Sequence, residues 1–136
     1  MKKKILILCI VVAVIISIFI IKSSFGTKLF KSLTTDEIKE VTVELLPPDV
    51  TISLNEQDIS ELTKILNDVV IYNKDNSYKD YDGQAVIYTI IKTDGTRITV
   101  TAYNPFLIID GVGYKTKYEP CQALNSLANS IRNKYE

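Results

Sequence analysis

The feature that most constrains this chain is an uninterrupted apolar run near its N-terminus. Met1 is followed by three lysines, and residues 5–21 are then apolar at every position except Ser17. At about 1.5 Å per residue, a helix over this run is roughly 25 Å long, which is near the short limit for crossing a bilayer. The run has no polar face, so a helix buried in a soluble core is the less favoured alternative. We predict that residues 5–21 lie in the membrane lipid bilayer.

Two interpretations of the fate of this segment remain open. An uncleaved anchor is favoured, because the apolar stretch of a signal peptide is typically about 7–15 residues and this run is longer. Cleavage near Gly26 is the alternative, because Ser24 and Gly26 are small residues at positions −3 and −1 of such a site. Cleavage there would release a secreted product that starts near Thr27.

The charges on either side of the run predict its orientation. Lys2, Lys3 and Lys4 precede it, whereas only Lys22 and Lys28 closely follow it. Because basic residues are retained on the cytoplasmic side, we expect a single-pass protein of the cell membrane with its N-terminus in the cytoplasm. The C-terminal domain is then extracytoplasmic. We also expect the Lys22 side chain to extend to the far interface.

The rest of the chain is long enough for one small domain with one core. The sequence divides into a membrane anchor or signal peptide at 1–26, a linker at 27–37 and a domain at 38–136. Four of the 16 basic residues belong to the anchor, which leaves 12 against 16 acidic residues from residue 27 onward. A mildly acidic domain without a basic stripe is a poor candidate for binding nucleic acid.

Several chemistries are excluded or disfavoured by composition. The chain has no His and 2 Cys, which excludes His-ligated zinc, imidazole bases and four-Cys metal sites. Cys9 lies in the apolar run, and Cys121 falls on the apolar stripe of a predicted helix, where we expect a structural thiol. The acidic loop that contains Asp80 does not have the spacing of an EF-hand calcium loop. We expect a protein that is not an enzyme, with no catalytic residue, no metal and no cofactor.

Apolar periodicity predicts an α+β domain. Asn55 and Asp58 resemble a capping box before one helix, and Glu119-Pro120 is typical of the start of a second helix whose apolar stripe ends at Tyr135. Strands in hairpins with helices on one face give the order ββαββββα, an antiparallel sheet of five or six strands with two helices on one face. Alternating apolar residues predict strands over 38–45, 50–54, 85–91, 97–103, 106–109 and 112–117.

Two Asp-Gly pairs, at 94–95 and 110–111, lie between strand-like runs and predict two-residue hairpin turns. A turn of known length fixes the register of the strands that it joins. The predicted cross-strand partners are Ile91 with Ile98 and Tyr88 with Thr101 in the first hairpin, and Ile109 with Val112 and Leu107 with Tyr114 in the second.

In that register, one sheet face is rich in Tyr and Thr and lies opposite the helices. Tyr combines a large apolar ring with a polar tip, which suits a protein interface. Tyr78 and Tyr81, in the polar loop at 72–83, extend the same patch. The alternative is an ordinary exposed face, since Thr and Tyr are good strand formers. The candidate partner-binding residues are Tyr88, Thr99, Thr101, Tyr103, Tyr78 and Tyr81.

The overall layout resembles that of many small uncharacterised single-pass membrane-anchored proteins of Gram-positive bacteria. The resemblance rests on Met1-Lys-Lys-Lys4, on one Ile/Val-rich span and on a short α+β domain. The use of Lys, Ile, Asn and Tyr, without Trp or His, is also similar to that of AT-rich genomes. The resemblance includes no specific motif, so it implies no activity and no functional residue.

These observations lead to one function hypothesis and two alternatives. The first is a non-enzymatic membrane-anchored extracytoplasmic domain that binds a membrane or envelope protein, or another envelope component. The second is a secreted or anchored inhibitor or immunity-type protein that acts through the loop at 72–83. The third is a small-ligand sensor domain, which requires a concave pocket that the sequence does not reveal.

Overall fold

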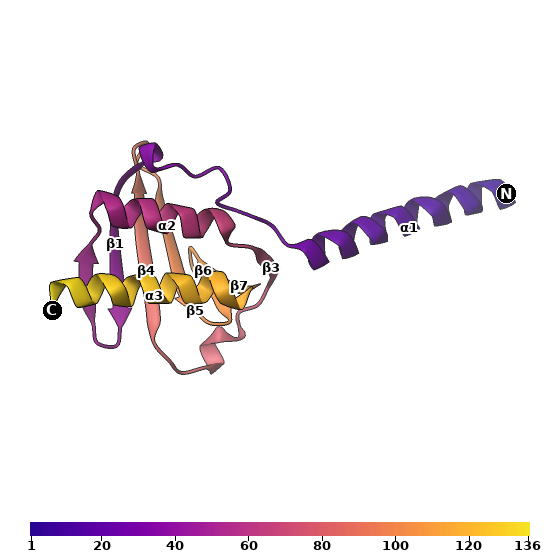
Figure 1. The fold of residues 1–136 in the computed structure, drawn as a ribbon. Coiled ribbons are helices and arrows are strands. Elements are labelled where there is room, and N and C mark those ends of the chain that lie inside the picture. The colour runs from indigo at the N-terminus through magenta and orange to yellow at the C-terminus, as the bar shows by residue number, and fades with distance from the viewer.

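Helices and strands form two layers in the domain that follows the N-terminal helix. The computed structural model describes residues 1–136, apart from the side chains of residues 22 and 23. A seven-stranded antiparallel sheet forms one layer and helices α2 and α3 form the other, which confirms the predicted α+β fold (Figure 1). The elements are α1 (Lys2–Phe25), η1 (Thr35–Glu37), β1 (Ile38–Leu46), β2 (Val50–Ser53), α2 (Glu56–Asp68), β3 (Ile71–Lys74), η2 (Ser77–Asp80), β4 (Ala85–Lys92), β5 (Arg97–Tyr103), β6 (Phe106–Ile109), β7 (Val112–Thr116) and α3 (Tyr118–Tyr135).

Helix α1 contains the apolar run and extends away from both layers (Figure 1). Its apolar side chains are exposed throughout, as Ile10 and Phe19 illustrate at 55% and 76%. Among the described residues, Lys2–Ile21 is one helix that is long and apolar enough to cross a membrane. A membrane anchor and a signal sequence share this property. The predicted placement of the Lys22 side chain lies outside the described residues.

The strand order in the sheet is β2-β1-β4-β5-β6-β7-β3. Strand β3 was not predicted, because only Ile71 of its four residues is buried and the strand shows no alternating pattern. Its pairing with β7 is also irregular. Thr27 and Ile71 form an isolated antiparallel bridge, so the chain contacts the sheet edge directly after α1.

The β4–β5 hairpin differs from the prediction by one residue. The N–H of Gly95 donates to the carbonyl of Lys92, and the N–H of Lys92 donates to the carbonyl of Thr96. These bonds close a three-residue loop in which Gly95 has a φ of 87° and forms a bulge. The observed partners are Ile90 with Ile98, Tyr88 with Val100, and Val86 with Ala102. A shift of one residue turns every side chain of β4 to the opposite face.

Tyr88 is therefore a core residue, and its predicted placement on the exposed sheet face is wrong. The side chain is fully buried beneath the helices. Its hydroxyl donates a hydrogen bond of 2.6 Å to the carbonyl of Leu124 in α3. Burial raises the pKa of the Tyr88 hydroxyl above its ordinary value.

The β6–β7 hairpin matches the prediction. Asp110 and Gly111 have φ values of 48° and 84°, as both positions of a two-residue type I′ turn require. Ile109 pairs with Val112 and Leu107 with Tyr114.

Helix α2 begins after its predicted cap, whereas α3 begins before the predicted Glu119-Pro120 start. Asn55 caps α2 by accepting the N–H of Asp58 at 2.9 Å, which confirms half of the capping box. The second bond of the box, from the N–H of Asn55 to the Asp58 carboxylate, is absent among the described contacts. The buried carboxylate instead accepts from Lys134 Nζ at 2.8 Å. Helix α3 starts at Tyr118, so Pro120 is its third residue, where no intrahelical N–H bond is lost. Tyr135 was predicted to end the apolar stripe of this helix, but its side chain is 60% exposed and does not belong to the stripe.

The core lies between the sheet and the two helices. Strands β1, β4 and β5 contribute their inward-facing residues, and α2 and α3 contribute one stripe each. Phe30 and Leu33, from the predicted linker, are also buried in this core. The fully buried side chains include Val43, Leu45, Leu62, Leu66, Val86, Tyr88, Ile90, Leu107, Leu124 and Ile131.

Candidate functional site

The sheet face opposite the helices is uncovered over β4 and β5. Helices α2 and α3 both lie on the other side of the sheet (Figure 1). Alternate residues of the two strands are fully buried on that side and partly exposed on this one. We call the partly exposed set the open face, and it consists of Ile87, Thr89, Ile91, Thr99, Thr101 and Tyr103.

Three of the predicted partner-binding residues belong to the open face, namely Thr99, Thr101 and Tyr103. They lie there because β5 keeps the predicted orientation while β4 is inverted. Cross-strand pairing places Thr99 beside Thr89 and Thr101 beside Ile87. The sequence prediction missed Ile87, Thr89 and Ile91, since it assigned their side chains to the helix-facing side.

Tyr78 and Tyr81 lie at the border of the open face. The ring of Tyr81 is 5.6 Å from that of Phe106, centroid to centroid, and the ring of Tyr78 is 6.4 Å from it. The hydroxyl of Tyr103 donates to the carbonyl of Tyr81. Tyr81 remains 59% exposed. Both loop tyrosines thus lie against Phe106 of β6, which is the cross-strand neighbour of Tyr103.

The segment that contains these tyrosines covers the neighbouring part of the sheet. Gly113 of β7 allows this approach, because a Cβ at Gly113 would overlap the carbonyl of Asp75 and lie 2.7 Å from the ring of Tyr78. The carboxylate of Asp75 accepts the N–H of Ser77 at 2.9 Å, and hydrogen bonds from Ser77 hold the pKa of Asp75 below its usual range. The open face therefore ends at β5, and residues 75–81 form its border.

Charged residues lie at the margins of the open face rather than at its centre. Glu44 and Glu40 of β1 pair with Ile87 and Ile91, which places both carboxylates along one side. Arg97 begins β5 opposite Ile91. The centre consists of Thr and Ile side chains. Such a surface, with an uncharged centre and a charged rim, has the arrangement found in protein interfaces.

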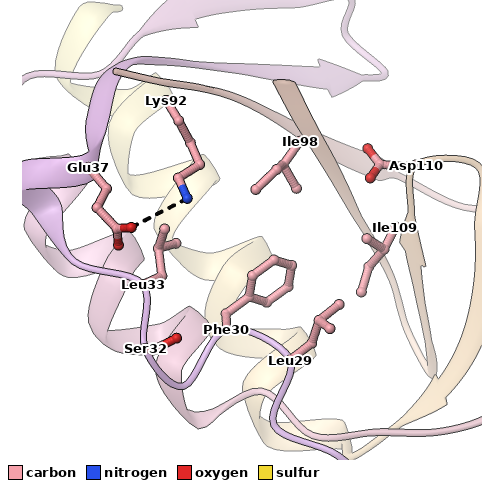
Figure 2. Close-up of a pocket in the computed structure, with 9 residues that line it drawn as sticks. All are labelled: Leu29, Phe30, Ser32, Leu33, Glu37, Lys92, Ile98, Ile109 and Asp110. Carbon is pink, nitrogen blue, oxygen red and sulfur yellow. Dashed lines mark hydrogen bonds and ion pairs between the residues drawn. The ribbon is translucent and has the colours of Figure 1, made fainter. Parts of the chain in front are cut away.

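A pocket of about 300 Å³ lies at the end of the domain where the hairpin tips meet the segment after α1. Leu29, Phe30 and Leu33 form one wall, and Ile98 and Ile109 form the other (Figure 2). The remaining lining residues are polar or charged, namely Ser32, Glu37, Lys92 and Asp110. No sequence pattern predicts this pocket directly, because its walls come from three distant segments. The apolar residues among 29–33 were the one available hint.

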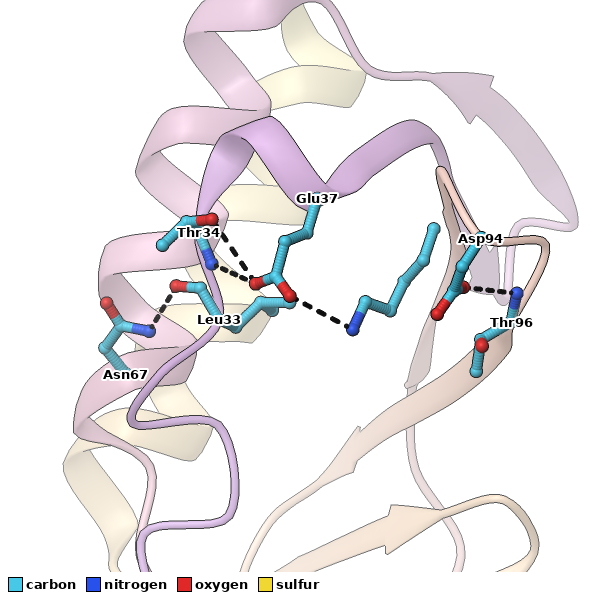
Figure 3. A network of polar contacts seen from close by, with 7 residues as sticks. Leu33, Thr34, Glu37, Asn67, Asp94 and Thr96 are labelled. Atoms are coloured by element: carbon cyan, nitrogen blue, oxygen red, sulfur yellow. Dashed lines mark hydrogen bonds and ion pairs between the residues drawn. The ribbon is translucent and has the colours of Figure 1, made fainter.

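A polar network holds the first wall in place (Figure 3). The side-chain amide of Asn67 donates to the carbonyl of Leu33 at 3.1 Å, as Figure 3 shows, and to the carbonyl of Phe30 at 2.7 Å. The carboxylate of Glu37 accepts the N–H of Thr34 at 3.0 Å and lies 3.4 Å from Lys92 Nζ. The hydrogen bond from the Thr34 backbone, with a smaller contribution from Lys92, holds the pKa of Glu37 below its usual range. Glu37 is therefore ionised at neutral pH.

The two Asp-Gly turns have similar side-chain contacts. Asp110 Oδ1 accepts the N–H of Thr99 at 2.9 Å, which fixes this carboxylate at the edge of the pocket. Asp94 Oδ1 accepts the N–H of Thr96 at 2.8 Å on the neighbouring turn, outside the pocket lining. Hydrogen bonds from Thr96 hold the pKa of Asp94 below its usual range.

The thiol of Cys121 lies in the core, as the sequence predicts for a residue on the apolar stripe. It is 1% exposed, and its Sγ is 3.4 Å from the carbonyl of Phe106. Burial raises the pKa of Cys121 to about 11. Among the residues whose side chains are described, no group of three or more Asp, Glu or Cys side chains is placed to hold a metal ion.

No protein-family model, no curated protein and no solved structure matches this chain.

Proposed function

We propose that this chain is a membrane-anchored domain that binds a membrane or envelope protein through its open face. The observation that carries the proposal is the uncovered face of β4 and β5. Most antiparallel sheets pack one face on a core and leave the other to water, so exposure alone does not distinguish an interface. The composition of this face supports the proposal, because its centre is uncharged and Ile87, Ile91 and Tyr103 contribute apolar area.

The aromatic border supports the same function. The hydroxyl of Tyr103 is held by its hydrogen bond to the backbone carbonyl of Tyr81, and the ring of Tyr81 packs on that of Phe106. An exposed aromatic side chain that is already fixed loses little conformational entropy on binding. The acidic margin formed by Glu40 and Glu44 favours a partner that presents basic residues there.

The proposed location is the outer side of the cell membrane. Helix α1 supplies the span, and Lys2, Lys3 and Lys4 favour a cytoplasmic N-terminus. The proposal therefore includes a partner in the same membrane or in the adjacent envelope.

A charged substitution at the centre of the open face tests this function. Thr101→Arg places a long cationic side chain between Ile87 and Ile108, the cross-strand neighbours of Thr101. We expect the chain, extracted from its native membrane in mild detergent, to migrate on a native gel as a complex larger than the monomer. Thr101→Arg is expected to reduce that species to the monomer, because it leaves an unpaired charge in the interface.

Gln122→Arg is the matched control, because Gln122 is exposed on α3, away from the open face. This variant is expected to retain the complex, and urea unfolding of both variants checks that the fold is kept. If wild type and both variants all migrate as the monomer, or all retain the same complex, the open face is not the binding surface.

A further inference from the structure

The pocket near the β4–β5 and β6–β7 turns combines aliphatic walls with charged side chains, unlike the uncharged centre of the open face. Its volume of about 300 Å³ equals that of roughly ten water molecules at about 30 Å³ each, which fits a ligand with a short aliphatic chain. We propose that this pocket binds a small aliphatic amine, whose chain lies between Leu29, Ile98 and Ile109 and whose ammonium group pairs with Asp110. The proposal goes beyond partner binding and does not depend on it.

The walls of the pocket account for the aliphatic part of the ligand. Ile98 and Ile109 come from adjacent sheet elements, and Leu29 closes the pocket from the segment after α1 (Figure 2). Leu29 is 48% exposed, although its neighbour Phe30 is buried. A bound chain would cover this exposed side chain and remove apolar surface from water on both walls.

The charges around the pocket determine the sign of the head group. Glu37 and Asp110 line the pocket with two carboxylates, and the lining contains a single ammonium, that of Lys92. Lys92 already pairs with Glu37 at 3.4 Å. The excess of negative charge favours a cation over an anion, and the net negative charge of the whole domain adds to this preference.

The position of Asp110 determines where the ammonium group binds. Figure 2 shows Glu37 and Lys92 at one side of the pocket and Asp110 at the other, with Ile98 between them. Asp110 Oδ1 is held by the N–H of Thr99, and no hydrogen bond among the described contacts occupies Oδ2. The carboxylate is therefore already oriented, with one oxygen left to accept from a ligand at the end remote from Lys92.

The experiment uses the full chain in nanodiscs of zwitterionic phospholipid, with isoleucine methyl groups labelled for NMR. Hexylamine is the probe, and hexan-1-ol and hexanoate have the same chain with a neutral and an anionic head. The methyl signals of Ile98 and Ile109 report on the pocket. Ile131, buried in α3, reports on any general effect, and empty nanodiscs measure partitioning of each probe into the bilayer.

Two matched variants test the head group. Asp110→Asn removes the charge but keeps an oxygen for the N–H of Thr99 and tolerates the positive φ of this position. Asp94→Asn makes the same change on the neighbouring turn, outside the pocket lining. The mass of each variant is checked before titration.

We expect hexylamine to shift the Ile98 and Ile109 signals saturably, with an affinity at least about tenfold higher than that of hexanoate. Asp110→Asn is expected to weaken hexylamine binding about tenfold, and Asp94→Asn to leave it within about twofold. An absence of saturable shifts would overturn the proposal, and so would equal affinity for hexanoate. An unchanged affinity in Asp110→Asn would overturn the assignment of the head group, and this outcome remains informative because the comparison of the three probes uses the wild-type chain.

Discussion

Tyr88 and Tyr103 occupy opposite faces of the sheet, and their hydroxyl groups are in different environments. The Tyr88 hydroxyl is buried and bonds to the carbonyl of Leu124, which ties β4 to α3. The Tyr103 hydroxyl bonds to the carbonyl of Tyr81 at the border of the open face, where water can replace a lost bond. The two residues therefore contribute differently to stability.

Removal of each hydroxyl tests this difference. Tyr88→Phe is expected to lower the free energy of unfolding by about 0.5–1.5 kcal/mol, the net value of a typical intramolecular hydrogen bond. Tyr103→Phe is expected to change it by about 0.5 kcal/mol or less, as for most exposed positions. Urea unfolding of the full chain in nanodiscs measures both. Equal losses in the two variants would contradict the burial assigned to Tyr88.

Cys121 gives a prediction about reactivity against pH. Its pKa of about 11 means that roughly a thousandth of the thiol is ionised at pH 8, where an ordinary cysteine with a pKa near 8.5 is about a quarter ionised. In a Cys9→Ser background, native protein is expected to react with a maleimide at least about tenfold more slowly than unfolded protein at pH 8. The rate should rise with pH up to about pH 11. Modification of the native protein at the rate of a free thiol would show that Cys121 is accessible.

At the scale of elements, the segment between α1 and β1 belongs structurally to the domain. Thr27 bridges to Ile71 at the sheet edge, and Phe30 and Leu33 are buried. Asn67 of α2 accounts for much of this docking, because its amide bonds to two carbonyls of the segment. A linker that packs in this way fixes the first residues of the domain close to the end of α1 and forms one wall of the pocket.

Asn67→Ala removes both of these hydrogen bonds. We expect a loss of about 1–2 kcal/mol in the free energy of unfolding, at about 1 kcal/mol for each bond. Amide hydrogen exchange at Leu33, whose N–H bonds to the carbonyl of Phe30, is expected to accelerate, because the segment opens more often. Asn133→Ala on the exposed side of α3 is the control and is expected to change neither quantity. Unchanged exchange at Leu33 in Asn67→Ala would show that other contacts hold the segment.

The two hairpins show how far the sequence predicts the elements. Both contain Asp-Gly, and both were predicted as two-residue turns. Asp110 and Gly111 adopt positive φ together, whereas on the other turn only Gly95 does, so the loop has one residue more. The same dipeptide fits either turn. Gly takes the position that has a positive φ in both turns, and Asp110 takes the second positive φ that only the two-residue turn requires. Apart from β3, the strands and helices were thus predictable from periodicity, but the orientation of β4, and with it half of the open face, was not.

The pocket was not predictable for a different reason. Its lining residues come from 29–37, from 92–98 and from 109–110, and they meet only when β5 lies beside β6 and the segment after α1 folds back on the sheet. A one-dimensional pattern does not contain this juxtaposition. The ion pair between buried Asp58 and exposed Lys134, which joins the start of α2 to the end of α3, was not predictable from the sequence for the same reason.

At the scale of the whole molecule, the chain combines an exposed apolar helix with a domain that has one covered and one uncovered sheet face. Over Lys2–Ile21 the helix is unburied, so its apolar side chains do not pack on the domain. A lipid bilayer would remove the apolar side chains of this helix from water. We infer that the open face is then presented at a membrane surface, where a partner in the same membrane is at high effective concentration. Anchoring and binding are thus parts of one proposal.

Site-specific photocrosslinking in native membranes tests anchoring and partner binding in a single experiment. A photoreactive amino acid is placed at Thr101 on the open face, and at Gln122 on α3 as the control, in the otherwise unaltered chain. We expect one discrete cross-linked product from Thr101 in the membrane fraction, with the N-terminal segment still attached, and no such product from Gln122. No product from Thr101, or the same product from both positions, would contradict the proposal.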